Sequence, residues 1–339
     1  MNRLALVIPG LLGPMPELEQ YEHVSPACPV LQKWLSSAEP VVTGARHYYD
    51  LLADLFGIHP EYSITQLSAL ADDGECAQGY WYRADPVHFK ADIDHAIMFD
   101  HNRLAISNAD AQALVTSFNQ HFREDGIELR ASHRHRWYLA FKTPLDIQTT
   151  WLEDAIGRNV NHFLPTGPDA LNWKRLLNET QMLFHNHDVN IQREAKGQLS
   201  INSLWLWGEG QEPRSLNTRN WDWVMSEEAV AKGLALWSGI KQISLDTQHD
   251  RLSLPDGNGM IVLDQMMGPT SYGDVQAWFD AVETICEQWF EKLHRLFITK
   301  QIQCVELYCA DGRMFKLTPF SLLKFWRRKK PVAQYVSLQ

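Results

Sequence analysis

Residues 179–210 read ETQMLFHNHDVNIQREAKGQLSINSLWLWGEG and contain the most specific pattern in the chain. They predict a helix, a glycine turn and then the apolar strand Ile201 to Trp207. Glycine is typical of a helix end because it adopts the left-handed conformation without a steric penalty. The helix carries His187, Asn190 and Arg193 at three-residue steps, which places them on one face. The segment therefore predicts a helix followed at once by a buried strand.

Alternating strands and helices elsewhere in the chain predict an α/β core. Leu4 to Ile8 is a short apolar run before Pro9-Gly10, typical of a central strand buried on both faces. Residues 47–56 have helical spacing, and a longer helix is expected over 274–297 with Asp274 as its cap. The last predicted strand is CVELYC at 304–309. We expect a three-layer core with a mostly parallel sheet.

The middle of the chain predicts a smaller α+β unit. A strand is expected to end at Asp85-Pro86, and a hairpin across Asp100 to Asn102. A helix capped by Asn108 follows, and then one extended strand over 128–141. The predicted domains are residues 1–80 for the first part of the core, 81–212 for the inserted α+β domain, and 213–339 for the second part of the core.

Several of these segments resemble a known family. The 185–210 region is similar to the segment of archaeal-type cofactor-independent phosphoglycerate mutases that begins HPVN and closes on an asparagine-bearing strand. FGIHPE at 56–61 resembles their LGYDP segment, and RLAISNADAQALVTSFNQ followed by RHRWYLAF resembles their inserted domain. The trailing SLWLWG is similar to the RpfE-type regulatory proteins of bacteria. The resemblance implies a discontinuous alkaline-phosphatase-like core that carries an inserted domain.

The resemblance also implies two divalent metal ions and a Ser or Thr nucleophile, because paired cations offset phosphoryl charge and acidify the attacking hydroxyl. This chain departs from that pattern. Pro9 stands where the first Asp ligand belongs, and proline offers no side-chain donor. Near the nucleophile position the candidates are Thr43, Tyr48 and Tyr49. The late Asp-His pair corresponds to Asp311-Gly312. We therefore expect no metal cofactor; Mn, Zn or Mg is the alternative.

Histidines offer another route to a metal site. On a helix His185 and His187 point apart, whereas His133 and His135 share a strand face and could chelate an ion together. The alternative is a half-exposed strand face of alternating His and Arg. Metal binding by these residues is not expected.

Anion recognition is the chemistry that the resemblance leaves in place. Arg suits phosphate or carboxylate because its planar guanidinium donates two parallel hydrogen bonds. The alternative is that His187 and Asn190 tie the helix end to the following strand while Arg193 pairs with Glu194 or solvent. The candidate anion-binding residues are His187, Asn190, Arg193, Asn202, Arg134 and Arg136.

Composition limits the classes of partner. The chain has 339 residues, of which 45% are hydrophobic, and a formal net charge of −10, which disfavours nucleic acid and anionic membranes. The basic run 327–330 is the exception and is expected to be a solvated end, with nucleic-acid binding as the alternative. Five cysteines without CxxC spacing predict free thiols in a reducing compartment. With no apolar run of roughly 18 residues, we expect a cytoplasmic protein without a membrane segment.

Two functions follow from these observations. The first is a non-catalytic relative of phosphoglycerate mutase with a regulatory role or a small phosphorylated or carboxylate ligand. The second is a metal-dependent phosphoglycerate mutase or phosphomonoester phosphotransferase with atypical ligands.

Overall fold

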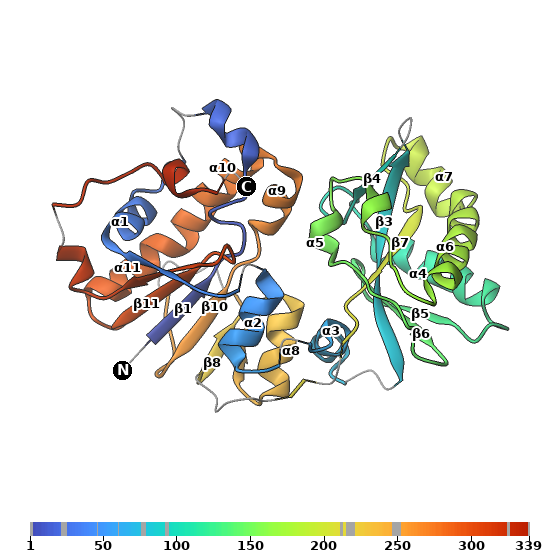
Figure 1. Cartoon of the computed structure of the whole chain (residues 1–339), viewed down its shortest axis with the longest axis horizontal. Helices are drawn as coiled ribbons and strands as arrows, with labels where there is room; N and C mark the ends of the chain where they lie inside the picture. Colours follow the sequence, from blue (N-terminus) through green and yellow to red (C-terminus); the bar gives the residue numbers. More distant parts are fainter. Residues whose placement is uncertain are drawn as a thin grey trace. The chain divides into compact units, whose positions relative to one another are not determined.

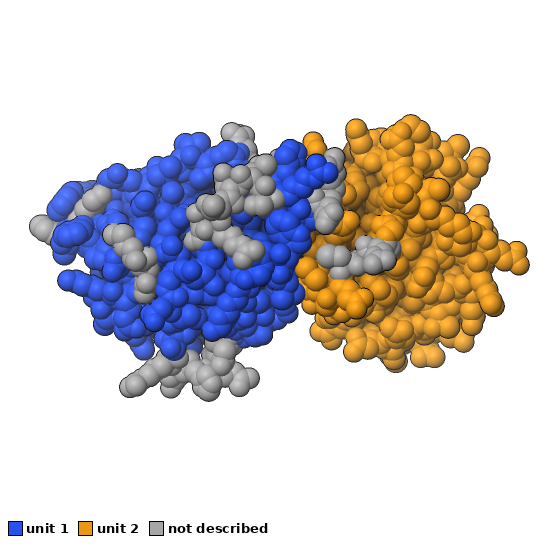
Figure 2. All heavy atoms as spheres, turned by 90° about the horizontal axis from the view of Figure 1, so that it is seen from below, with its two compact units in different colours: residues 1–60, 213–339 blue, residues 61–212 orange. Residues whose placement is uncertain are grey.

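The chain divides into two compact units. A computed structural model describes residues 3–21, 26–45, 47–59, 61–75, 79–91, 95–210, 213–214, 221–245, 252–323 and 326–337. Unit 1 contains residues 1–60 and 213–339, and unit 2 contains residues 61–212 (Figure 2). The first division therefore lies at 60/61 rather than at 80/81, because helix α3 (Ile64–Asp73) packs against strand β3 of unit 2.

Unit 1 is built on a seven-stranded sheet in the order β2-β12-β11-β1-β10-β8-β9. Strand β1 is central, as predicted, and the pairs from β11 to β9 are all parallel. The prediction that 304–309 is the last strand is wrong, because β12 turns back and pairs antiparallel with β11. The strands are β1 (Arg3–Val7), β2 (Glu39–Val42), β8 (Trp223–Met225), β9 (Lys241–Ile243), β10 (Gly259–Val262), β11 (Cys304–Tyr308) and β12 (Arg313–Leu317). The mostly parallel sheet is thus confirmed.

Helices cover both faces of this sheet. Leu4 and Leu6 of β1 belong to one apolar cluster with α1, α10 and α11, whereas α2 and α8 lie over the other face (Figure 1). Asp274 caps α10 through the N–H of Ala277, as predicted. The helices are η1 (Pro16–Tyr21), α1 (Pro29–Ser37), α2 (Tyr48–Phe56), α8 (Ala229–Trp237), α9 (Met267–Tyr272), α10 (Val275–Ile285), the π-helical turn η3 (Cys286–Phe290), α11 (Glu291–Ile298), η4 (Ser321–Leu323) and η5 (Val332–Tyr335). The result is a three-layer unit.

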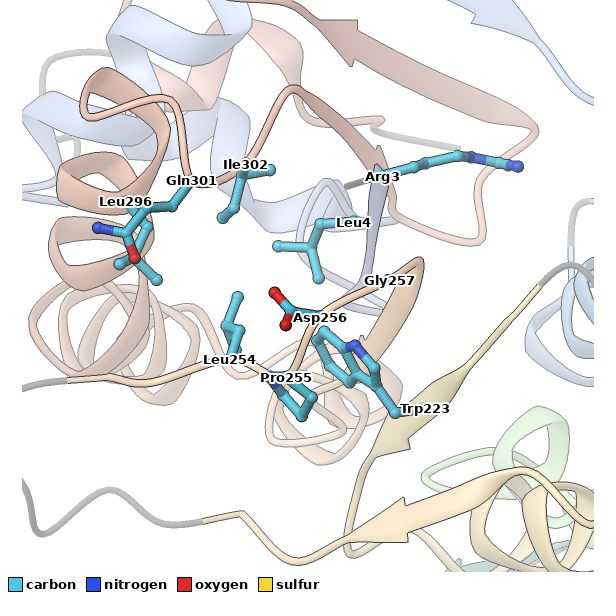
Figure 3. A pocket seen from close by; sticks show the side chains of 10 residues that line it. All are labelled: Arg3, Leu4, Trp223, Leu254, Pro255, Asp256, Gly257, Leu296, Gln301 and Ile302. Atoms are coloured by element: carbon cyan, nitrogen blue, oxygen red, sulfur yellow. The ribbon is translucent and has the colours of Figure 1, made fainter. Parts of the chain in front are cut away.

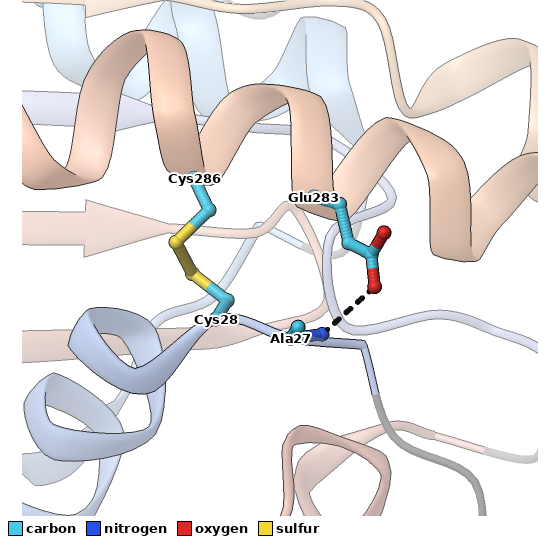
Figure 4. Close-up of a disulfide and its surroundings, with 4 residues drawn as sticks. All are labelled: Ala27, Cys28, Glu283 and Cys286. Atoms are coloured by element: carbon cyan, nitrogen blue, oxygen red, sulfur yellow. Dashed lines mark hydrogen bonds between the residues drawn. A yellow bond between two sulfur atoms is a disulfide. The ribbon is translucent and has the colours of Figure 1, made fainter.

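A disulfide joins two helices of unit 1. Cys28 precedes α1 and bonds to Cys286 at the start of η3, where the N–H of Ala27 also donates to Glu283 (Figure 4). The prediction of free thiols is therefore wrong for this pair, because residues 258 positions apart in sequence meet only in the folded core. Cys304 and Cys309 are free, and Cys76 lies outside the described residues.

Unit 2 is built on an antiparallel sheet in the order β4-β3-β6-β5. Strand β7 also pairs with β3, on the side opposite β6. Its strands are β3 (Tyr80–Ala91), β4 (Ala96–Phe99), β5 (Glu128–His133), β6 (Arg136–Phe141) and β7 (Ser203–Trp207). The predicted end at Asp85-Pro86 is wrong. Pro86 lies within β3, opposite Leu204 of β7 and beyond the segment that pairs with β6, so a strand can lack an N–H donor on that side.

Two other strand predictions in unit 2 are corrected. Residues 128–141 are a hairpin rather than one strand, with a tight turn between β5 and β6. The expected hairpin across Asp100 to Asn102 does not form. The Asp100 carboxylate instead accepts the N–H of Asn102, which closes a local turn, and the chain continues into the core at Leu104.

Helices α4 and α6 pack on one face of the unit 2 sheet. Leu114 and Phe118 of α4 and Trp173 of α6 share one apolar cluster with β3, β6 and β7. Ser107, not Asn108, caps α4, through a capping box with Asp110. The helices are α3, α4 (Asn108–His121), α5 (Leu152–Ala155), η2 (Val160–His162), α6 (Ala170–His185) and α7 (Asp188–Ala195). The single helix predicted through His187 is two helices, because His187 is an extended N-cap residue.

No helix within the described residues combines the length and the apolar character needed to cross a bilayer.

Candidate functional site

The carboxyl edge of the unit 1 sheet is the place to look for a ligand site, because ligands of parallel α/β sheets bind beyond the carboxyl ends of the strands. At this edge β1 is followed by Pro9, β10 by Asp264 and β8 by Glu228. Helix α2 begins at Tyr48. The Tyr48 hydroxyl bonds to Glu228, which shows that the start of this helix lies at the same edge. These residues form the candidate site.

Tyr48 and Glu228 are the best-defined pair of this site. The Tyr48 hydroxyl donates to the Glu228 carboxylate over 2.6 Å. The same carboxylate caps α8, since it accepts the N–H groups of Val230 and Ala231 at 3.0 and 2.8 Å. Burial raises the pKa of the Tyr48 phenol well above its usual value, and the charge of Glu228 raises it further. The hydroxyl is therefore a protonated donor at neutral pH, which is the opposite of what a nucleophile needs.

The turn after β1 is held by two side chains that donate hydrogen bonds to its backbone. The Gly10 carbonyl accepts the Thr270 hydroxyl at 3.0 Å and the Trp278 indole N–H at 3.2 Å. Gly10 has φ +83°, and a Cβ there would lie 2.6 Å from the Thr270 hydroxyl. Pro9 is buried beside this turn and presents no donor atom to the edge.

The carboxylates at this edge differ in their surroundings. Asp311, the predicted counterpart of the late Asp-His pair, turns back onto β12 and binds the guanidinium of Arg313. Asp264 follows β10, which is paired directly with β1, and is half-buried. In the sequence, Asp264 is one of the residues considered for a metal site, and it stands directly after the apolar run GMIVL, which is typical of a strand. Among the described residues, no three His, Cys, Asp or Glu side chains are grouped so that they could share a metal ion.

Thr43, the predicted alternative nucleophile, lies beside β2, which is an outermost strand of the seven-stranded sheet. It follows β2, and its N–H donates to the carbonyl of Gly312. Three strand spacings of about 4.8 Å each separate β2 from β1 in the sheet order, which amounts to about 14 Å. Thr43 is therefore not adjacent to Pro9.

His47 caps α2 at this site and gives it a pH dependence. Its ring Nδ1 accepts the N–H of Tyr49, and burial lowers the pKa of His47 to about 3. The unfolded chain, with a His pKa near 6.5, binds a proton that the folded site does not. Stability is therefore expected to fall as pH falls below 6.5, by about 1–2 kcal/mol between pH 7 and 5.

The His47→Asn variant tests this expectation in urea unfolding measured at pH 7, 6 and 5. Asn keeps a capping side chain but does not titrate, so the variant should lose most of this slope while remaining stable at pH 7. His59→Asn, at an exposed histidine of the same unit, is the matched control. An unchanged slope in His47→Asn would show that His47 is not responsible.

The predicted anion-binding residues on α7 are engaged in local structure. The Asn190 amide donates to the carbonyls of Phe184 and Ile201 and accepts the N–H of Ile201, all at 2.7–2.8 Å. His187 accepts the N–H of Val189 and its other ring nitrogen meets the Ser117 hydroxyl. Asn190 thus ties the end of α6 to the approach to β7, which was the structural alternative for this residue.

Arg193 is buried and bound on both sides of its guanidinium. It donates to the carbonyls of Leu199 and Ala105 at 2.9 and 3.2 Å, and to the Asp110 carboxylate at 2.9 Å. The expected partner Glu194 is not the one found. Asp110 also belongs to the capping box of α4, so this ion pair joins α7 to α4.

The other three candidates lie elsewhere in unit 2. Asn202 exchanges two hydrogen bonds with the backbone of Phe89. Arg136 donates to the Asp72 carboxylate of α3, and Arg134 is exposed on the turn between β5 and β6. The six predicted residues are therefore distributed over three places, one at α7, one at the start of β7 and one at the β5-β6 turn.

On the β5-β6 turn, His135 stacks on His101 and meets His133 edge-on. The ring of His135 lies 4.8 Å from that of His101 and 5.2 Å from that of His133, centroid to centroid. Burial, followed in effect by the charge of the neighbouring His101, lowers the pKa of His135 to about 3. Burial also opposes the charged form of His101, but its bond to Asp100 prevails and raises the pKa. As pH falls, His101 therefore takes up a proton before His135 does.

A cavity of about 140 Å³ lies at the opposite, amino edge of the unit 1 sheet (Figure 3). Leu4 at the start of β1, Trp223 at the start of β8 and Asp256 before β10 line it. The buried indole N–H of Trp223 has no hydrogen-bond partner among the described residues. The cavity is small for an organic ligand and lies away from the carboxyl edge.

Comparisons with known proteins place the likeness mainly in unit 2. A family model described as 2,3-bisphosphoglycerate-independent phosphoglycerate mutase matches residues 64–190. The enzyme of that name from Methanosarcina mazei is 24% identical over 203 residues, which are 55% of this chain and 51% of that protein. Mutase 2 of Methanothermobacter thermautotrophicus is 25% identical over 167 residues, 47% of this chain and 42% of that protein. The chain spans about half the length of the curated relatives it matches.

One of the solved structures compared shares the fold at low identity. The PH0037 protein of Pyrococcus horikoshii has a TM-score of 0.54 at 12% identity, covering 94% of this chain and 87% of that one. A cofactor-independent phosphoglycerate mutase of Thermoplasma acidophilum has a TM-score of 0.44 at 14% identity, covering 98% and 95%. At these identities the likeness to PH0037 concerns the fold alone.

Proposed function

We propose that this chain is a phosphoglycerate-mutase-like protein that does not transfer phosphoryl groups and instead has a regulatory or ligand-binding role. Its core is proposed to be alkaline-phosphatase-like, and its role is proposed to be similar to that of the RpfE-type regulatory proteins. The observation that carries the proposal is Pro9, which follows the central strand where the resemblance calls for an aspartate ligand.

Two further features of the carboxyl edge support the loss of catalysis. A divalent metal pair needs several carboxylate or imidazole donors around each ion. Here Asp311 is bound to Arg313, and Glu228 is committed to the cap of α8. A nucleophile needs a lowered pKa or an adjacent base. Tyr48, at the start of α2, has a raised pKa.

The range of sequence similarity fits the same proposal. The family match at 64–190 falls inside unit 2, so it does not reach the carboxyl edge of unit 1. Unit 2 keeps its internal polar network and its aromatic strand β7, which contains the SLWLW sequence.

An active metal-dependent phosphotransferase is the second candidate. Asp264 beside β1 is the feature that favours it, since a carboxylate at this edge could contribute to a metal site. Thr43 would then be its nucleophile, although its distance from β1 in the sheet opposes that role.

The decisive experiment measures turnover and metal content together. Purified protein is assayed with 3-phosphoglycerate and with p-nitrophenyl phosphate in the presence of Mn, Zn or Mg, beside the Methanosarcina mazei mutase as a positive control. We expect turnover no higher than in protein-free samples and no stoichiometric bound metal.

The outcome that would overturn the proposal is also defined. Stoichiometric metal with turnover that disappears in Thr43→Ala and survives in Thr43→Ser would establish the phosphotransferase, because Ser keeps the hydroxyl that the reaction needs.

A further inference from the structure

Unit 1 contains a cavity of about 390 Å³ at the β2-β12 end of its sheet. It is bounded by the end of α1, by β2 and β12, and by the C-terminal segment 327–335. Its volume lies in the usual range of small-molecule sites, about 300–1,000 Å³. The sheet order separates it from β8 and β10, so it is distinct from the candidate site at the carboxyl edge.

Hydrogen bonds fix the C-terminal segment over this cavity. The Arg327 guanidinium donates to the carbonyl of Ala38 at 2.8 Å. The N–H of Lys330 and the hydroxyl of Tyr335 each donate to the Ser36 hydroxyl at 3.2 Å. Arg313 of β12 donates to the carbonyl of Tyr335 at 2.8 Å. The basic run is therefore held against α1 and β12 rather than extending as a free end.

The cavity has a local excess of positive charge. Four cationic residues line it, and two of them are neutralised: Arg313 by Asp311, and Arg327 by Glu39 at 3.2 Å. The other two are Arg328 and Lys330. Both are exposed, and neither has an ion-pair partner among the residues that the structure describes. Two positive charges thus face a site whose lining includes no acidic residue.

The rest of the lining is largely apolar. Leu35, Pro40 and Phe315 contribute hydrocarbon surface, and the ring of Tyr335 lies edge-on to Phe315 with centroids 6.4 Å apart. Apolar walls with a few placed charges are typical of sites for organic ligands. An inorganic ion alone would leave this surface unused.

We propose that this cavity binds a soluble phosphomonoester that carries an apolar or aromatic body. A phosphomonoester has a charge of about −1.5 to −2 at neutral pH, which matches the two uncompensated cations. The Arg328 guanidinium can donate two parallel hydrogen bonds to phosphate oxygens, and the Lys330 ammonium supplies a point charge. The inference rests on the ligand-binding part of the proposed function and not on the loss of phosphoryl transfer.

A change at Lys329 distinguishes binding in a defined pocket from general electrostatic attraction to the basic run. It lies between Arg328 and Lys330 and is equally exposed, but it is not part of the lining. A nucleic acid or membrane surface attracted by the run as a whole would depend on all three charges to a similar degree. The net charge of −10 already opposes such polyanions.

The test is isothermal titration calorimetry of the full chain with phenyl phosphate, whose ring models the apolar body. We expect saturable binding to the wild type, weakened about tenfold or more in Arg328→Ala and in Lys330→Ala, because each removes a charge-assisted contact. Lys329→Ala should bind like the wild type. Benzoate, which carries one charge, should bind more weakly than phenyl phosphate. Melting temperatures without ligand confirm that the variants fold.

Three results would overturn the proposal. The first is no binding of phenyl phosphate to the wild type. The second is an equal loss in Lys329→Ala, which would assign the effect to the charge of the run. The third is binding to vesicles that contain phosphatidic acid without binding of phenyl phosphate, which would assign the site to a lipid headgroup. Turnover assays are unaffected by any of these results, so failure here is distinguishable from failure of the proposed loss of catalysis.

Discussion

Replacing Asp85 with Ala is expected to destabilise unit 2 by about 3–5 kcal/mol. Asp85 and Arg83 are 2% and 6% exposed, and the Arg83 guanidinium donates to the Asp85 carboxylate through two N–H groups, at 2.6 and 3.1 Å. The carboxylate also accepts the backbone N–H of Trp137 and the indole N–H of Trp207. The variant leaves a guanidinium and two N–H donors buried without this acceptor, and desolvated donors of this kind are costly.

The measurement is urea unfolding, with hydrogen exchange of β3 and β7 amides to report on unit 2. Asp73→Ala is the matched control, because its ion pair with Arg130 is partly exposed and should contribute about 1 kcal/mol or less. The Arg83→Met/Asp85→Ala double variant should be less destabilised than Asp85→Ala alone, since it removes the buried charge as well. Equal effects in Asp85→Ala and Asp73→Ala would contradict the buried-network interpretation.

Replacing Asn190 with Ala is expected to cost about 3 kcal/mol, roughly 1 kcal/mol for each hydrogen bond that its side chain makes with backbone. Asn190 is fully buried, and its amide joins the last turn of α6 to Ile201 before β7. Ala has no polar atoms, so nothing in the variant side chain replaces the hydrogen bonds of the amide. Strand β7 should therefore exchange its amide protons faster.

Gln192→Ala provides the comparison, since Gln192 is an exposed residue of the same helix. Its unfolding free energy should change by less than about 0.5 kcal/mol. The experiment also separates the two interpretations of the HNHDVNIQR segment. If Asn190→Ala retained full stability while losing an anion that stabilises the wild type, the residue would be a ligand contact and the structural interpretation would be wrong.

Elements with strong local periodicity could be predicted from the sequence. Strand β1, helix α2 and the long α10-to-α11 helix lie where the apolar pattern indicates, because each buries a continuous stripe or run of its own residues. The errors in the strand predictions occur where pairing with a neighbouring strand, rather than the local sequence, decides the structure. Pro86 remains inside β3 because β7 pairs with β3 at this position while β6 does not reach it, and residues 128–141 fold into a hairpin whose turn has no Gly.

The candidate site shows the same division. Pro9 could be recognised as a missing ligand without any coordinates, since the position follows a predicted central strand. The Tyr48–Glu228 bond could not, because it joins residues 180 positions apart whose own segments give no sign of each other. The disulfide between Cys28 and Cys286 was missed for the same reason.

The sequence by itself determined which chemical groups are available: a proline after the first strand, a basic run near residue 330, and His187, Asn190 and Arg193 at three-residue steps. Only the tertiary structure decided how those groups are used. Arg193 meets Asp110, 83 positions earlier in the chain, and the basic run is bound against α1. The physical reason is that the residue type fixes which donors a side chain has. Packing between segments distant in sequence decides which acceptors those donors meet.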